Sequence, residues 1–270
     1  MKKNHIAIIG AGNIGISIAK GLIESQSFNA ENITLTRRKI QLLDNMRKQG
    51  FIVEKDNKKA VRNSDVIIIA VEPQQIDGVL KEINPHLTPK KHIVLSVVTG
   101  VSIKRISKHI GKKVSIIRAM PNTAIAVRES MTCIVSDKTD ANAIEVAKSI
   151  FETVGKTQVI NEEQMNSATA LVACGIAFFF RAIRAASQGG IEIGFHSDEA
   201  LAMAAQTAKG AASLLLTNRQ HPEHEIDRVT TPRGCTIAGL NQMEHEGFSS
   251  AMIRGIVQSA DKASKLYESD

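Results

Sequence analysis

The sequence predicts an α/β protein with a Rossmann-type, doubly wound sheet over residues 1–160 and an all-helical domain over residues 161–270. Three observations predict this fold. An apolar segment at residues 5–9 runs directly into a glycine-rich turn and a helical pattern. Apolar, β-branched runs then alternate with helical stretches as far as residue 160, which is typical of a parallel sheet with helical crossovers. No convincing strand follows residue 161.

Each predicted strand is a short apolar run rich in Val and Ile. The runs at 65–71 and 92–98 are almost continuously apolar, as expected for parallel strands buried on both faces. The predicted strands are residues 5–9, 32–36, 51–53, 65–71, 92–98, 114–118, 131–135 and 157–160. Helices are predicted at 16–23, 40–48 and 140–153.

The second half is predicted to contain long helices. The first covers residues 162–188 and is stopped by Gly189-Gly190, the second covers 198–217, and the third covers 241–267 with a break at Gly247. Apolar residues occupy nearly every face of the first helix, so we expect it to be buried on most sides. The C-terminal domain is too small to bury such a helix alone, which predicts a homodimer or higher homo-oligomer paired through residues 161–270. A monomer with this helix packed against the first domain is the alternative.

The glycine turn is the motif G-x-G-x-x-G, written here Gly10-Ala11-Gly12-Asn13-Ile14-Gly15. In such a turn the first glycine permits the tight bend, the second lets a pyrophosphate approach the backbone, and the third lets helix and strand pack closely. The start of the following helix offers free N–H groups and a positive dipole end. The motif predicts dinucleotide binding; a glycine-rich turn without a ligand is the alternative.

The end of the second strand favours one form of the cofactor. Proteins that bind NAD commonly carry a carboxylate there for the ribose 2′-hydroxyl, but this strand ends Leu35-Thr36-Arg37-Arg38-Lys39. Arginine offers paired donors that suit a 2′-phosphate. We therefore expect NADPH, with NADH as the second choice. A charged first helical turn is the alternative reading of these residues.

Composition excludes several classes of protein. The chain has 270 residues, 43% hydrophobic and 23% charged, as in ordinary globular proteins. The net charge is +7, but the basic residues are scattered and aromatics make up only 3%, so nucleic-acid binding is not expected. No apolar run approaches the length of a membrane span. The N-terminus lacks signal-peptide features. The three cysteines are widely spaced and form no disulfide framework or metal motif, so we expect a cytoplasmic protein without a bound metal.

Three further segments follow predicted strands or open a helix. They are Ala70-Val71-Glu72-Pro73-Gln74, Met120-Pro121-Asn122-Thr123, and Thr231-Pro232-Arg233-Gly234-Cys235-Thr236-Ile237-Ala238-Gly239-Leu240. The first two lie at carboxyl ends of strands, where open α/β sheets bind ligands. The third reads as a loop and helix start whose N–H groups can hold a carboxylate, or as an ordinary helix cap.

Together with the glycine turn, these segments resemble the pyrroline-5-carboxylate reductase family over essentially the whole chain. The family motifs are G-x-G-N-M-G, A-V-K-P-Q, M-P-N-T and S-P-G-G-x-T-x-x-G-L, in the same order. The resemblance implies reduction of 1-pyrroline-5-carboxylate to L-proline, the last step of proline biosynthesis, by hydride transfer from NAD(P)H. It implies Thr236 as the catalytic residue and Thr231, Gly234, Cys235 and Thr236 as substrate-binding residues. The cofactor-binding residues expected are Gly10, Ala11, Gly12, Asn13, Ile14, Thr36, Arg37, Arg38, Asn57, Ala70, Val71, Glu72, Pro73, Met120, Pro121 and Asn122.

The sequence departs from the family pattern at several of these positions. Glu72 stands where the family usually has Lys, and Arg233 replaces a glycine. The family's S-G-S-G-P-A on the long helix is here residues 172–177, Val-Ala-Cys-Gly-Ile-Ala, and Arg219 replaces a usual acidic residue. These changes leave open a related cyclic imine as substrate.

Two other functions share the predicted architecture. A β-hydroxyacid dehydrogenase needs a lysine acid/base on the long helix, and residues 167–180 contain none. A redox sensor that binds NADP without turnover has no use for the loop that carries Thr236.

Overall fold

The computed structural model describes residues 4–111, 114–136 and 140–267. The chain divides into two compact units, each described here by itself. The first comprises Met1–Ala173 and Ala260–Asp270, and the second Cys174–Ser259.

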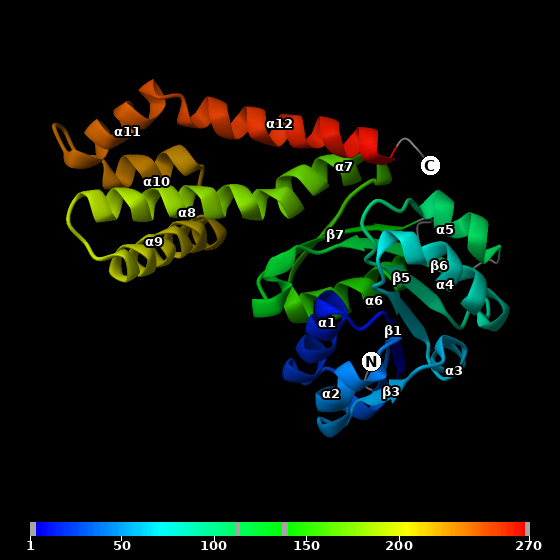
Figure 1. Cartoon of the computed structure of the whole chain (residues 1–270). Coiled ribbons are helices and arrows are strands. Elements are labelled where there is room, and N and C mark those ends of the chain that lie inside the picture. The colour runs from blue at the N-terminus through cyan, green and yellow to red at the C-terminus, as the bar shows by residue number, and fades with distance from the viewer. Residues whose placement is uncertain (1–3, 112–113, 137–139, 268–270) are drawn as a thin grey trace. The chain divides into compact units, whose positions relative to one another are not determined.

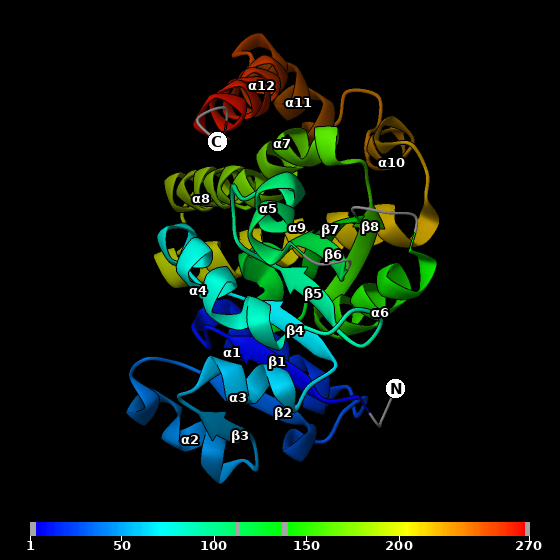
Figure 2. The ribbon, with the colours of Figure 1, turned by 90° about the vertical axis from the view of Figure 1, so that its right-hand side faces the viewer.

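The first unit is built on one eight-stranded sheet with the strand order β3-β2-β1-β4-β5-β6-β7-β8 (Figure 2). Strands β1 to β6 lie in the order 3-2-1-4-5-6 of a Rossmann sheet. These six strands are mutually parallel. The strands are β1 (Ile6–Ile9), β2 (Ile33–Thr36), β3 (Ile52–Glu54), β4 (Val66–Ile69), β5 (Ile93–Ser96), β6 (Ser115–Met120), β7 (Ser130–Ser136) and β8 (Gly155–Val159). All eight predicted strands are present, so the predicted fold class is confirmed.

Strand β7 runs antiparallel to β6, a feature that the simple strand–helix alternation did not predict. The connection between them holds only a short 3-10 helix at Thr123–Val127. A parallel crossover needs a dozen or more residues, so this short connection requires a reversal of direction.

Helices cover both faces of the sheet (Figure 1). Along the central strands, successive side chains alternate between the two faces. In β1, Ile6 and Ile8 face one core, and Ala7 and Ile9 face the other. The first core is closed by α1 (Asn13–Glu24), α2 (Asp44–Lys48) and α6 (Ala141–Phe151), and the second by α3 (Asn57–Arg62), α4 (Ile76–Ile83), α5 (Ile103–Ile110) and α7 (Met165–Ala168). A π-helical turn, Thr169–Cys174, follows α7.

The second unit is entirely helical in the residues described. Its helices are α8 (Gly175–Glu192), α9 (Ser197–Asn218), α10 (Pro222–Val229), α11 (Cys235–His245) and the first part of α12 (Phe248–Tyr267). Helix α10 was not predicted. The predicted break at Gly247 is present, with φ at +77°.

The predicted stop at Gly189-Gly190 is wrong, because α8 continues through both residues to Glu192. A Cβ atom on Gly190 would lie 3.0 Å from the Cβ of Ala200 on α9. Gly190 therefore serves close packing of two helices, a role that cannot be told from a helix stop by composition.

The expectation that the long helix is buried on most sides is also wrong for one chain. Among the residues of α8, only Gly175 and Ser187 are buried, while Phe179 and Phe180 are 63% and 64% exposed. The segment Glu162–Glu192 is long and apolar enough to cross a membrane, with a mean hydropathy of 1.6 and 17% burial over its most apolar window. The prediction that no apolar run approaches the length of a membrane span is therefore wrong for this segment. The helix exposes an apolar surface that one chain does not cover.

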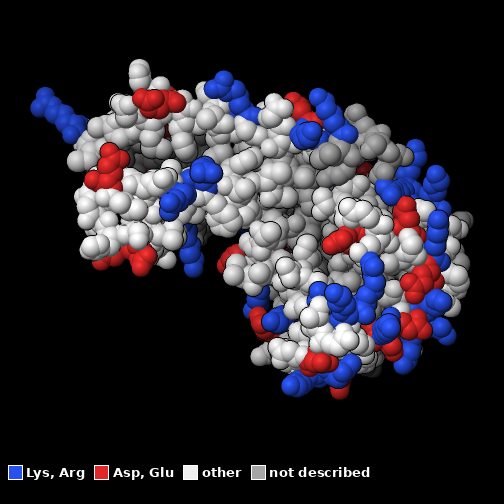
Figure 3. All heavy atoms as spheres, viewed as in Figure 1, with Lys and Arg blue, Asp and Glu red and all other residues white. Residues whose placement is uncertain are grey.

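Charges of both signs are mixed over the surface. On the face in view, Figure 3 shows Lys and Arg side chains interspersed with Asp and Glu over the sheet-containing unit. This view shows no extended basic stripe of the kind that binds nucleic acid.

Candidate cofactor and substrate sites

The carboxyl ends of β1, β2 and β4 meet at one edge of the sheet. Ile9, the last residue of β1, is paired with Thr36 on one side and with Ile69 on the other. Strands β2 and β4 flank β1, so the chain runs from β1 to β2 on one side and returns from β3 to β4 on the other side. Ligands of open α/β sheets bind in the crevice at such a switch point.

The glycine turn has the geometry that its sequence predicts. Gly10 has φ at +92°, and a Cβ atom there would lie 2.7 Å from the Ala70 carbonyl oxygen. A Cβ atom on Gly15 would lie 2.9 Å from the Gly10 carbonyl oxygen, whereas one on Gly12 would meet no protein atom within 4 Å. Gly12 caps α1 without a side chain, so the first N–H groups of the helix face open space beside it. This cradle fits a pyrophosphate.

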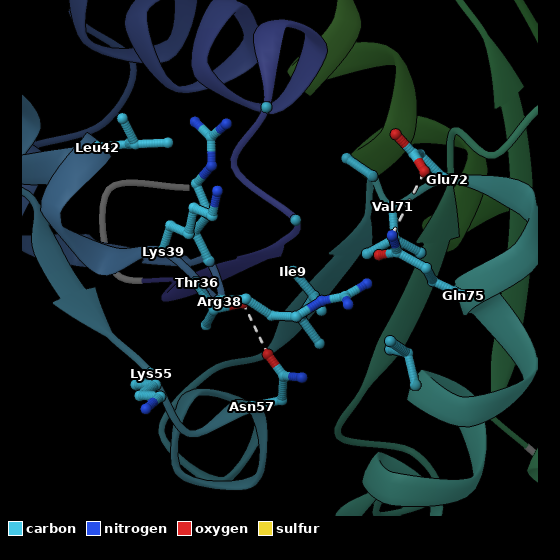
Figure 4. Close-up of a pocket in the computed structure, with 15 residues that line it drawn as sticks. Ile9, Thr36, Arg38, Lys39, Leu42, Lys55, Asn57, Val71, Glu72 and Gln75 are labelled. Atoms are coloured by element: carbon cyan, nitrogen blue, oxygen red, sulfur yellow. Dashed lines mark hydrogen bonds between the residues drawn. The ribbon is translucent and has the colours of Figure 1, made fainter.

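A cavity of about 500 Å³ lies at this edge of the sheet (Figure 4). Nine of the residues predicted to bind cofactor line it: Gly10, Gly12, Thr36, Arg37, Arg38, Asn57, Ala70, Val71 and Glu72. The sequence analysis did not assign the other lining residues, Ile9, Lys39, Leu42, Lys55, Gln75 and Val79. Lys55 directly follows β3, the neighbour of β2. The rule that ligands bind at carboxyl ends of strands could have identified it.

The cations of this cavity differ in what they contact. The Arg37 guanidinium donates to the Ala11 carbonyl oxygen at 3.2 Å. The side chains of Arg38, Lys39 and Lys55 make no hydrogen bond or ion pair with any described residue, and Figure 4 shows Arg38 extending across the cavity from the end of β2. Three cations that have no partner within the described parts of the chain can attract an anion to this cavity.

The nearby carboxylates are engaged elsewhere. Lys59 lies 2.7 Å from Glu54, and this pairing holds the pKa of Glu54 below its ordinary value. Glu72, at the opposite wall, accepts a hydrogen bond from the Gln75 amide at 3.4 Å (Figure 4). Glu54 therefore does not neutralise Lys55.

A chain of hydrogen bonds joins two residues that line the cavity, Thr36 and Asn57, to Glu82, which does not line it. The Thr36 hydroxyl donates to the Asn57 Oδ1 at 2.7 Å, and the Asn57 Nδ2 donates to Glu82 at 3.0 Å. Thr36 is buried, and Asn57 and Glu82 are half-buried.

The remaining residues predicted for the cofactor do not line the cavity. Ala11, Asn13 and Ile14 belong to the glycine turn and the start of α1, and Pro73 begins the turn before α4. Met120 and Pro121 are buried at the end of β6. The Asn122 side chain accepts from the Ala124 N–H at 3.1 Å and donates to the Val172 carbonyl oxygen at 3.4 Å. Asn122 thus caps its own loop and holds it against the π-helical turn.

The residues predicted to bind substrate lie together in the second unit, at the start of α11. Gly234 caps this helix, and its N–H donates to the Thr231 carbonyl oxygen at 2.9 Å. A Cβ atom on Gly234 would lie 2.4 Å from the Thr231 Oγ1, so only glycine fits. Thr236 is exposed, and its hydroxyl makes no hydrogen bond with any described residue. The segment thus contains a helix cap, Gly234, but the Thr236 side chain is not part of it.

Comparison with known proteins agrees with this geometry. A sequence model described as "Pyrroline-5-carboxylate reductase dimerisation" matches residues 162–266, and one described as "NADP oxidoreductase coenzyme F420-dependent" matches residues 5–100. The chain is 49% identical to pyrroline-5-carboxylate reductase 2 of Dictyostelium discoideum, over 98% of this chain and 94% of that protein. The chain belongs to the pyrroline-5-carboxylate reductase family.

Members of this family are oxidoreductases that act on a C=N bond with NAD(P)H. Pyrroline-5-carboxylate reductase 1 of the same organism is 54% identical over 98% of this chain, but this chain spans only 50% of that relative's length. The structure of a pyrroline-5-carboxylate reductase from Coxiella burnetii is 30% identical, with a TM-score of 0.93 over 97% of this chain and 98% of that one. The family resemblance predicted from the motifs is confirmed.

Proposed function

We propose that this chain reduces 1-pyrroline-5-carboxylate to L-proline, the last step of proline biosynthesis, with NADPH as preferred reductant and NADH as an alternative. The observation that carries the proposal is the cavity at the carboxyl end of the sheet. There an open glycine cradle stands beside Arg38, Lys39 and Lys55, three cations without partners among the residues that the structure describes. Such a cavity fits a dinucleotide with an additional phosphate. The full-length relatives at 49% and 32% identity, both named pyrroline-5-carboxylate reductase, support the substrate.

The bound nicotinamide would supply the hydride. We propose that the N–H groups around Gly234, Cys235 and Thr236 bind the substrate carboxylate, because the start of a helix attracts an anion. The Thr236 hydroxyl can donate to, and accept from, the ring nitrogen as the imine becomes an amine. A pyrroline nitrogen is basic enough to carry its own proton, so the protein's contribution is mainly orientation.

We further propose that residues 1–160 hold the cofactor and that residues 161–270 pair the subunits and hold the substrate. The exposed apolar surface of α8 supports pairing, as does the match to a dimerisation family over residues 162–266. Three free cysteines, one of them exposed, support a reducing compartment, the cytoplasm.

To test the proposal, enzyme at micromolar concentration is mixed with NADPH and 1-pyrroline-5-carboxylate. The oxidation of NADPH is then monitored by its absorbance. Turnover that yields proline supports the proposal. NADPH binding without turnover of this imine, but with turnover of a related cyclic imine carboxylate, indicates a divergent enzyme. Binding with no turnover of either indicates a non-catalytic protein.

A further inference from the structure

The chain Thr36–Asn57–Glu82 has only one consistent arrangement of donors and acceptors. An ionised carboxylate only accepts hydrogen bonds, so the Asn57 atom that lies 3.0 Å from Glu82 is the amide nitrogen. The Asn57 Oδ1 is then the atom that faces Thr36 at 2.7 Å. An amide oxygen only accepts, so the Thr36 hydroxyl must donate to it.

This order fixes what Thr36 offers to a ligand. Its single proton is directed to Asn57, so the Thr36 oxygen presents only lone pairs to the cavity that it lines. A ribose hydroxyl can donate to such an oxygen, whereas the oxygens of a phosphate dianion cannot. Without Glu82 the Asn57 amide is free to turn, its nitrogen then donates to Thr36, and the hydroxyl proton becomes available to a phosphate.

We propose that Glu82 is a positioning residue for cofactor choice: acting through Asn57, it holds the Thr36 hydroxyl as an acceptor and thereby favours the 2′-hydroxyl of NADH over the 2′-phosphate of NADPH. Arg38, Lys39 and Lys55 act in the opposite direction, so the chain keeps both cofactors usable. This inference rests on the proposed function, in that the cavity takes a nicotinamide dinucleotide.

The experiment measures dissociation constants of NADPH and NADH from the fluorescence of the reduced nicotinamide, without substrate. The glutamine in Glu82→Gln can donate a hydrogen bond as well as accept one. The Asn57 amide is then no longer held in one orientation. We expect this variant to raise the ratio of the NADH constant to the NADPH constant about fivefold, the factor one ordinary hydrogen bond provides. Glu31→Gln, an exposed glutamate before β2, makes the same charge change and should leave the ratio unchanged. An unchanged ratio in Glu82→Gln overturns the proposal.

A second variant separates hydroxyl orientation from loss of charge. Thr36→Val removes the hydroxyl with little change of shape. In a chain that carries Thr36→Val, the added change Glu82→Gln should no longer alter the ratio of the two dissociation constants. If the ratio still changes fully, the effect comes from the lost charge alone and the proposal is overturned. Thr36→Val by itself should weaken NADH more than NADPH, which keeps the test decisive even where Glu82→Gln fails to fold, and the reverse order contradicts the proposal.

Because these are binding measurements, they also separate the two claims. Failure to turn over 1-pyrroline-5-carboxylate removes the proposed activity and leaves the role of Glu82 testable. A wild-type chain that binds neither cofactor removes both.

Discussion

At the scale of single residues, Arg37 and Arg38 are adjacent in the chain but differ in what they contact. Both line the cavity, but Arg37 donates to the Ala11 carbonyl oxygen and so joins the end of β2 to the glycine turn, whereas Arg38 has no partner among the described residues. Both residues carry the same charge, but we expect different roles: Arg37 braces the glycine turn, and Arg38 is available to a phosphate.

Arg38→Ala should therefore weaken the binding of NADPH about tenfold and leave the binding of NADH nearly unchanged, because one charge-assisted contact contributes about 1.5 kcal/mol or more. Arg37→Ala should weaken both cofactors alike, since both need the glycine turn. Dissociation constants for the two cofactors check this, with the exposed Arg47→Ala on α2 as control. Equal losses of both cofactors in Arg38→Ala would exclude a 2′-phosphate contact.

Thr236 is the second residue of α11, where its side chain caps nothing. Thr236→Ala should lower kcat/KM about tenfold or more, roughly 1.4 kcal/mol of transition-state stabilisation, while the melting temperature stays the same. Thr236→Ser should recover most of the activity because it keeps the hydroxyl. Steady-state kinetics and thermal melts of both variants check this, with the exposed Thr207→Ala on α9 as control. Wild-type turnover by Thr236→Ala would exclude a catalytic role for the Thr236 hydroxyl.

At the scale of elements, the packing of each helix decides what its glycines do. Gly21 lies inside α1, and a Cβ atom there would lie 2.1 Å from the Val154 Cγ1. Gly78 lies inside α4, and a Cβ atom there would meet nothing within 4 Å. The first glycine allows a close approach to the segment before β8, and the second is a local weakness of its helix.

The same substitution should have opposite effects at these two positions. Gly21→Ala should destabilise the protein by about 1–3 kcal/mol, as overpacking does in a full core. Gly78→Ala should stabilise it by up to about 1 kcal/mol through helix propensity. Chemical denaturation of the two variants measures both values. Stabilisation by both would mean that α1 can move away from Val154.

At the scale of the whole molecule, the apolar surface of the long helical segment requires a cover. Leu171 is 59% exposed in one chain, so Leu171→Asp buries no charge in a monomer. In a dimer paired through this segment, the same change places an unpaired charge in the interface, at a cost of several kcal/mol. We expect a dimer or larger assembly for the wild type, and monomers with lost activity for Leu171→Asp.

Light scattering at micromolar concentration measures this outcome. Val127→Asp is the matched control, because Val127 is 70% exposed but lies outside residues 161–270. It should assemble like the wild type. A monomeric wild type would contradict the prediction.

The sequence by itself determined the elements that depend on local pattern. Apolar runs of β-branched residues located all eight strands, and the glycine spacing located the turn after β1, because strand burial and backbone freedom are properties of neighbouring residues. Four specific motifs in order determined the family. The signals for Thr36, Arg38 and Glu72 were likewise local, since each ends a strand or follows one within three residues.

The tertiary structure decided whatever depends on residues distant in the chain. It showed that Gly190 meets Ala200 instead of ending a helix, that β7 reverses direction, and that Lys55 joins Arg38 at the cavity. It also placed Glu82, on α4, against Asn57 on α3. Hydrogen bonds and close packing between distant segments leave no periodic trace in a sequence, so only the folded chain reveals which polar atoms remain for a ligand.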